Sequence, residues 1–100
     1  MTYSTSMVSN LVREPMACFS VTADNDPATL PRVLEVFAKR GLTPYQCYAT
    51  AFGANGEDLH IDLQYPGLAH SEAEHMARSL RGHFLVKSVL TSQKQNRQIA

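Results

Sequence analysis

Four histidines are the side chains of this sequence best suited to bind a metal ion or carry a proton. His70 and His75 are five residues apart, so on a helix they do not share a face as an i, i+4 pair would. Cys18 and Cys47 form no CxxC pair and fall in strand-like runs, which predicts two buried free thiols. The spacing therefore predicts no metal site.

Motifs for a nucleophile or a phosphate are also missing from the sequence. No serine lies in a GxSxG turn, and the five glycines are isolated, with none in the first strand-to-helix turn. His60 alternates with Asp62 and Gln64, and we interpret this polar row as a solvated or interfacial sheet face rather than an active site. We therefore predict no catalytic residue, no cofactor and no enzymatic activity.

The loop before the first helix, residues 24–28, is the segment with the chemistry of a small-molecule site. The N–H groups of a helix N-terminus suit a carboxylate, and Asp24 or Asp26 could receive an ammonium group. Those are the two charged ends of an amino acid. The same residues also suit an ordinary capped helix with solvated acids, and the pattern alone leaves both interpretations open.

An amphipathic helix must position this loop. Its apolar stripe recurs at i, i+3, i+4 and i+7, in Leu30, Val33, Leu34 and Phe37. An N-cap at Asp26 would place Pro31 inside the helix, where it removes a hydrogen bond, so we place the cap at Ala28 or Thr29. Gly41 ends the helix, and the cations of its expected last turn are Lys39 and Arg40.

The remaining pattern predicts four strands and a second helix. Strand-like runs cover 16–23, 43–54, 57–65 and 84–92, and Asn55-Gly56 supplies a hairpin turn between the middle two. A capping box of Ser71 and Glu74 opens the second helix, whose stripe is Ala73, Met76, Ala77 and Leu80. The order predicts an α+β fold, a ferredoxin-like βαββαβ sandwich with a four-stranded antiparallel sheet and two helices on one face.

The length of 100 residues allows one domain, which we place at 15–93 between an N-terminal arm, 1–14, and a polar C-terminal tail, 94–100. Nine basic and nine acidic residues balance, which argues against nucleic acid as a partner. RNA-recognition modules share this element order, but the third strand turns His60, Asp62 and Gln64 outward instead of aromatics. With no signal peptide and no membrane span, we expect a cytoplasmic protein.

The segment "FSVTADNDPATLPRVLEVFAKRGLTP" resembles the first strand, loop and helix of ACT domains, the small-molecule sensing modules of amino-acid metabolism. The more specific similarity is to the small regulatory subunit of acetolactate synthase (acetohydroxyacid synthase), through "PATLPRVLEVFAKRG", "EDLHIDLQY" and "LTSQKQNRQIA". The resemblance implies a non-catalytic partner of a thiamine-diphosphate-dependent catalytic subunit in branched-chain amino-acid synthesis. It also implies a homodimer that joins sheets and first helices.

The resemblance further implies an effector site for valine, leucine or isoleucine at the dimer interface. The matching positions are Asp24, Asn25, Asp26, Ala28, Thr29 and Leu30, with the N–H groups of Ala28 and Thr29 meeting the ligand carboxylate. Effector-binding members usually carry glycine where Ala28 stands, so Ala28→Gly should create binding if the methyl group closes a latent site. The short chain and this alanine favour an accessory subunit, and the alternative is a free-standing homodimeric ACT sensor of an amino acid.

Overall fold

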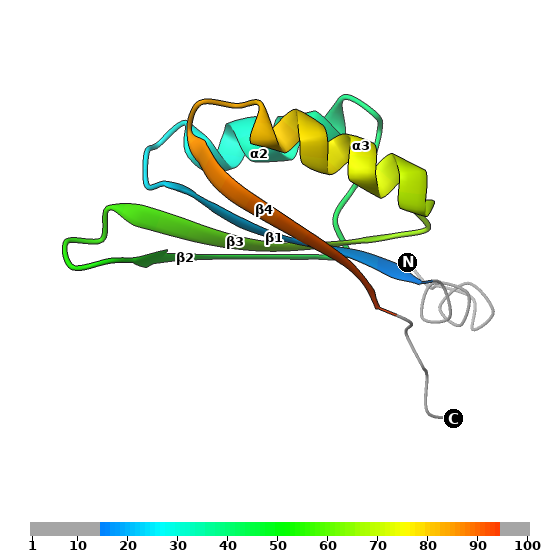
Figure 1. Ribbon diagram of the computed structural model, residues 1–100, viewed down its shortest axis with the longest axis horizontal. Helices are drawn as coiled ribbons and strands as arrows, with labels where there is room; N and C mark the ends of the chain where they lie inside the picture. The colour runs from blue at the N-terminus through cyan, green and yellow to red at the C-terminus, as the bar shows by residue number, and fades with distance from the viewer. Residues whose placement is uncertain (1–14, 95–100) are drawn as a thin grey trace, which may run out of the picture.

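Two helices lie on one face of a four-stranded antiparallel sheet in the computed structural model, which describes residues 15–94 (Figure 1). The elements in chain order are β1 (Met16–Asp24), α2 (Thr29–Ala38), β2 (Gln46–Phe52), β3 (Asp58–Pro66), α3 (His70–Arg81) and β4 (Val86–Lys94). The sheet order is β2-β3-β1-β4. The predicted βαββαβ ferredoxin-like fold is therefore confirmed, while the predicted arm 1–14 and tail residues 95–100 lie outside the described part.

The core lies between the helices and one face of the sheet. Alternate residues of the two central strands point into it, and all are at most 1% exposed: Ala17, Phe19, Val21, Ala23, Ile61, Leu63 and Tyr65. The Phe37 ring of α2 stacks on Tyr65 at a centroid distance of 4.1 Å and meets the edge of Phe19 at 5.1 Å. The period of two in the strands and the apolar stripes of the helices thus fill the same layer, as predicted.

Helix α2 begins and ends close to the predicted points. Its N-cap is Ala28, which confirms the later start and leaves Pro31 in the first turn, where no intrahelical donor is needed. The last helical residue is Ala38, so Lys39 is the C-cap and Arg40 lies beyond the helix, not in its last turn. Gly41 adopts φ 73°, and the chain closes with the Leu42 N–H donating to the Phe37 carbonyl at 3.1 Å.

The predicted capping box of the second helix is wrong. Helix α3 begins two residues earlier than that box requires, with Ala69 at the N-cap, and Glu72 accepts the Ala69 N–H at 3.0 Å. Glu74 lies further along the helix and accepts a hydrogen bond from the Thr91 hydroxyl of β4 at 3.1 Å. Since Glu72 lies three residues after the cap, it takes the position that Glu74 was expected to fill.

Two strand boundaries and one burial prediction also differ from the structure. The hairpin between β2 and β3 has the five-residue loop 53–57 rather than a two-residue turn, and both Gly53 and Gly56 adopt positive φ. Strand β4 begins at Val86, and Phe84 before it is 85% exposed. Neither cysteine is buried as predicted. Cys18 is half-buried, and Cys47 is exposed because β2 is an edge strand that neither helix covers; both cysteines are free.

Candidate functional site

The loop between β1 and α2 is held in place by the two connections beside it. The Asp24 N–H donates to the Leu85 carbonyl and the Asn25 N–H to the Glu57 carbonyl, each at 2.9 Å. The Asn25 side-chain amide donates to the Gly56 carbonyl at 2.8 Å. These three hydrogen bonds hold the loop against the β2–β3 hairpin and the segment before β4. The loop therefore has a defined position at one end of the sheet.

Asp26 occupies the N–H groups at the start of α2. Its carboxylate accepts the Ala28 N–H at 2.8 Å, and its main-chain carbonyl accepts the Thr29 N–H at 2.9 Å. Pro31 has no N–H, which leaves Leu30 as the remaining donor of the first turn. The two donors that we expected to meet a ligand carboxylate are thus satisfied within the loop.

The carboxylate of Asp24 has a cationic neighbour from β4. Lys87 Nζ lies 3.6 Å from Asp24 and donates a hydrogen bond to Asp58, the residue paired with Asp24 in the sheet. The hydrogen bond to Asp58, reinforced by both carboxylates, raises the pKa of the Lys87 ammonium. An ammonium group from a ligand would therefore have to compete with Lys87 for Asp24.

The structure keeps the six predicted residues in one turn but does not give them the same surroundings. Thr29 is buried, and its hydroxyl donates to the Asp24 carbonyl at 2.6 Å, whereas Asn25 and Asp26 are exposed. Sequence reasoning did not find Asp58 and Lys87. Only the antiparallel register brings them to Asp24. The assignment of the six residues to an effector stays a prediction.

A second group of polar side chains lies on the sheet face opposite the helices. His60 Nε2 is 3.4 Å from the Ser20 hydroxyl and 3.2 Å from Asp62 Oδ1. A serine hydrolase triad needs the carboxylate on one ring nitrogen and the serine on the other, whereas here both contacts use Nε2. This trio is a hydrogen-bonded surface row and does not have the geometry of a triad.

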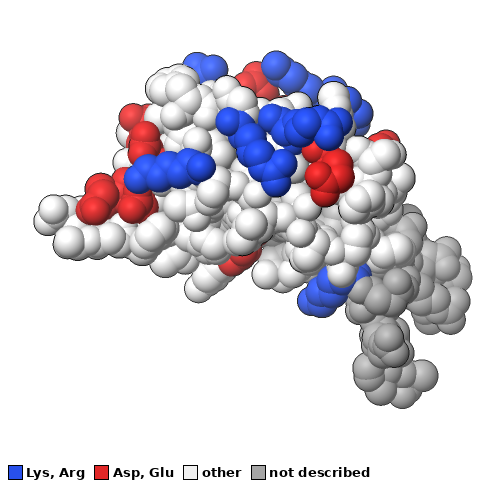
Figure 2. Space-filling model, in the orientation of Figure 1, with Lys and Arg blue, Asp and Glu red and all other residues white. Residues whose placement is uncertain are grey.

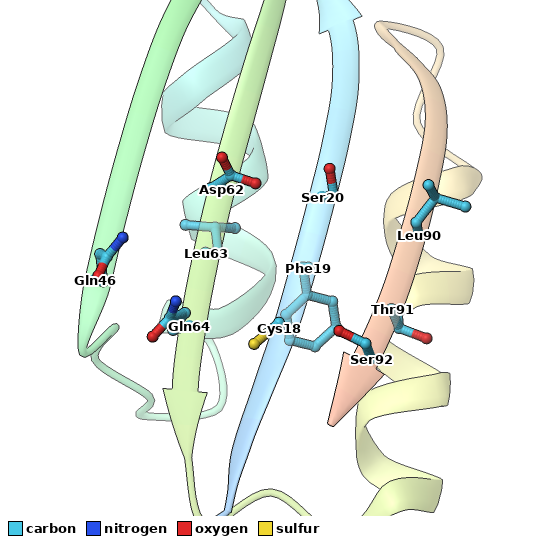
Figure 3. A pocket seen from close by; sticks show the side chains of 10 residues that line it. All are labelled: Cys18, Phe19, Ser20, Gln46, Asp62, Leu63, Gln64, Leu90, Thr91 and Ser92. Carbon is cyan, nitrogen blue, oxygen red and sulfur yellow. The ribbon is translucent and has the colours of Figure 1, made fainter. Parts of the chain in front are cut away.

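The same face is hollowed between its strands. The hollow has a volume of about 480 Å³, and all four strands contribute to its lining (Figure 3). Its polar lining comprises Cys18, Ser20, Gln46, Asp62, Gln64, Thr91 and Ser92, with Phe19, Leu63 and Leu90 as the apolar members. One carboxylate is the sole charged group of this lining.

Residues 15–94 offer neither a metal site nor a membrane-spanning helix. These residues contain no group of three histidine, cysteine, aspartate or glutamate side chains placed to hold a metal ion. The two described helices are too short and too polar to pass through a membrane.

Comparison with known proteins identifies the family. The solved structures that resemble this one include the ACT domain of GTP pyrophosphokinase from Chlorobium tepidum, at 12% sequence identity and a TM-score of 0.64, covering 77% of this chain and 96% of that one. The C-terminal domain of the MgtC protein from Mycobacterium tuberculosis is also 12% identical, with a TM-score of 0.65, covering 88% and 96% of the two chains.

At this level of identity the similarity to these structures concerns the fold alone. No curated protein matches the sequence. The sequence model of the ACT-like domain matches residues 10–98, which is most of the chain. The chain therefore belongs to the ACT-like domain family.

Proposed function

We propose that this protein is a non-catalytic accessory subunit that binds and activates the catalytic subunit of an acetolactate synthase in branched-chain amino-acid synthesis. ACT domains are generally regulatory, amino-acid-sensing modules without catalytic activity. The specific partnership is drawn from the resemblance of residues 16–100 to the regulatory subunits of that enzyme.

The main observation in support of an accessory role is that the edge strand β2 is exposed and uncharged. All seven residues of this edge strand are exposed, and none of them is charged. Edge strands that remain free usually carry lysine, proline or a bulge, because an open row of N–H and C=O groups can pair with another chain. A neutral, uncovered edge supports a function in which another protein strand covers it.

The contacts inside the β1–α2 loop argue against a small ligand at this site. Asp26 occupies the Ala28 and Thr29 N–H groups, and Lys87 accompanies Asp24. A bound amino acid would have to displace both interactions before it gained any of its own. We propose that the loop acts mainly as a capped turn and that β2, with the adjacent α2, forms the homodimer.

Sedimentation velocity of the protein alone and mixed with an acetolactate synthase catalytic subunit, with acetolactate production measured in parallel, tests the proposal. We expect the two proteins to co-sediment and the activity to rise. A homodimer that neither binds the catalytic subunit nor changes its activity would contradict the accessory role. It would favour the alternative, a free-standing sensor, whose melting temperature an amino acid should raise.

A further inference from the structure

The edge strand β2 carries two exposed aromatic residues on the sheet face opposite the helices. Tyr48 is 64% exposed and stands opposite Asp62 of β3, and Phe52 is 42% exposed and stands opposite Asp58, whose carboxylate already accepts a hydrogen bond from Lys87. Figure 2 shows charged side chains gathered over the helix layer and the loop end, with few on the sheet side. Exposed aromatic residues in a region of few charges are typical of protein interfaces.

A single copy of the chain offers too little of this face for a stable contact. Four strands about 4.8 Å apart and about eight residues long, at about 3.4 Å per residue, cover roughly 500 Å². A stable interface buries about 800 Å² on each partner. The proposed homodimer joins two sheets through β2, so the eight strands of its continuous open face, the joined face, cover roughly 1,000 Å². The joined face is therefore large enough for a stable contact.

Pairing through β2 also gathers the aromatic residues at the centre of the joined face. The central residue of Gln46–Phe52 is Ala49, and a two-fold axis through it, perpendicular to the sheet, pairs Tyr48 with Thr50 of the second copy. The Tyr48 side chains of the two copies are then diagonal neighbours within roughly 8 Å, a distance that aromatic side chains span. This pair of tyrosines exists only in the homodimer.

We propose, on the basis of the accessory function proposed for this protein, that the catalytic subunit docks on the joined face with the two Tyr48 side chains at the centre of the contact. Aromatic side chains near the middle of an interface commonly contribute most of its binding energy. A large flat surface with a central aromatic pair suits a folded protein rather than a small molecule.

The polar residues around Tyr48 define the chemistry of the partner surface. Asp62 stands opposite Tyr48 and is the sole charged group lining the hollow of Figure 3, to which Gln46, Gln64 and Ser92 add amides and a hydroxyl. Charge complementarity requires an arginine or lysine of the catalytic subunit opposite each Asp62 carboxylate. The partner surface should therefore combine apolar pockets over the tyrosines with one cation over each hollow.

The experiment measures binding of the full chain to the catalytic subunit of acetolactate synthase by sedimentation velocity. Tyr48→Thr removes the central ring and keeps a residue suited to a strand, so binding should weaken at least about tenfold while the variant alone remains a dimer. Phe84→Thr makes the same change at a ring that is 85% exposed outside the four strands and should leave binding unchanged. Asp62→Asn should reduce the dependence of binding on salt, and an unchanged dependence would overturn the cation opposite Asp62.

Ala49→Lys tests whether the joined face is required. Ala49 pairs with the core residue Ile61, so position 49 lies on the helix side of β2 and leaves the open face unchanged. The resulting monomer keeps Tyr48 but only half of the face, so it should bind the catalytic subunit at least about tenfold more weakly. Circular dichroism confirms that each variant is folded.

The outcomes separate the docking surface from the accessory role. A native chain that does not bind the catalytic subunit would overturn both. Native binding that Tyr48→Thr leaves unchanged, or that the monomeric Ala49→Lys variant retains in full, would overturn the joined face as the docking surface and leave the accessory role standing.

Discussion

At the scale of single residues, Tyr65 is the clearest conflict between packing and hydrogen bonding. The side chain is 1% exposed and stacks on Phe37, yet its hydroxyl is the one buried side-chain polar atom within residues 15–94 that has no hydrogen-bond partner. Burial, with a smaller effect from Cys47, raises the pKa of this hydroxyl far above its ordinary value. The ring stabilises the core while the hydroxyl opposes it.

We expect Tyr65→Phe to increase the free energy of unfolding by about 1 kcal/mol at neutral pH, because it removes an unpaired buried hydroxyl and keeps the ring. The folded pKa is raised, so the unfolded state loses its proton first and stability falls as pH rises above about 10. The variant should show a shallower alkaline decline. Urea unfolding across pH measures both effects, with Tyr45→Phe as the exposed control; a less stable Tyr65→Phe would contradict this account.

Asp26 already accepts the N–H of Ala28, a donor that the predicted effector site would need for a ligand carboxylate. We expect Ala28→Gly alone to show no rise in melting temperature with millimolar valine, leucine or isoleucine, because the N–H at position 28 remains bonded to Asp26. Adding Asp26→Ala to Ala28→Gly also frees that donor, so any latent site should appear in the double variant. Binding by Ala28→Gly alone would show instead that the methyl group closes the site.

At the scale of elements, the residues at the helix ends differ in the backbone conformation that they must adopt. Ala28 caps α2 in an ordinary right-handed conformation, with φ −83°, so this turn needs no glycine. Gly41, after the other end, adopts φ 73°, a region that costs other residues energy. Gly82 caps α3 at φ −77°, which any residue can adopt. Gly41 and Gly82 both follow a helix in the sequence, but only Gly41 has a conformation that favours glycine, so their importance for stability is unequal.

We expect Gly41→Ala to lower the free energy of unfolding by about 1 kcal/mol, since nothing lies within 4 Å of the added carbon and the cost comes from the backbone alone. Gly82→Ala is the matched control. Its added carbon meets the Ser79 carbonyl oxygen at an ordinary 3.5 Å, so stability should stay equal or rise slightly. Urea unfolding compares the pair. Equal losses would contradict the conformational explanation.

At the scale of the whole molecule, one layer of helices leaves two kinds of sheet surface uncovered. Figure 1 shows both helices on the same side of the sheet, so the opposite face is free of secondary structure within the described residues. The outer edges differ in charge. Strand β2 has no charged residue, whereas β4 carries Lys87 and Lys94. Self-pairing of β4 would bring cations together, so β2 is the better edge for a homodimer.

We expect Ala49→Lys to weaken the proposed edge dimer at least tenfold, because a two-fold axis near the centre of β2 would bring two added cations together. Gln93→Lys makes the same kind of change on β4 and should leave the dimer intact. Light scattering at matched concentrations measures the association of the Ala49→Lys and Gln93→Lys variants. A dimer that survives Ala49→Lys would remove β2 from the interface.

The sequence by itself determined the element order, the core and the start of α2. The period-two strands and the 3.6-residue stripes are local patterns, and Pro31 excluded an earlier helix start through its missing N–H. The start of α3 after Ala69 and the start of β4 at Val86 were missed, because neighbouring residues offer equally good local signals and packing chooses among them.

Only the tertiary structure decided the surroundings of the loop and the exposure of β2. Lys87 and Asp58 reach Asp24 through strand pairing between distant segments, which no local spacing encodes. Cys47 lies in a strand-like run that suggested burial, but the sheet order places its strand at an edge. Propensity is a property of a few neighbouring residues, whereas burial and charge pairing depend on which segments meet across the fold.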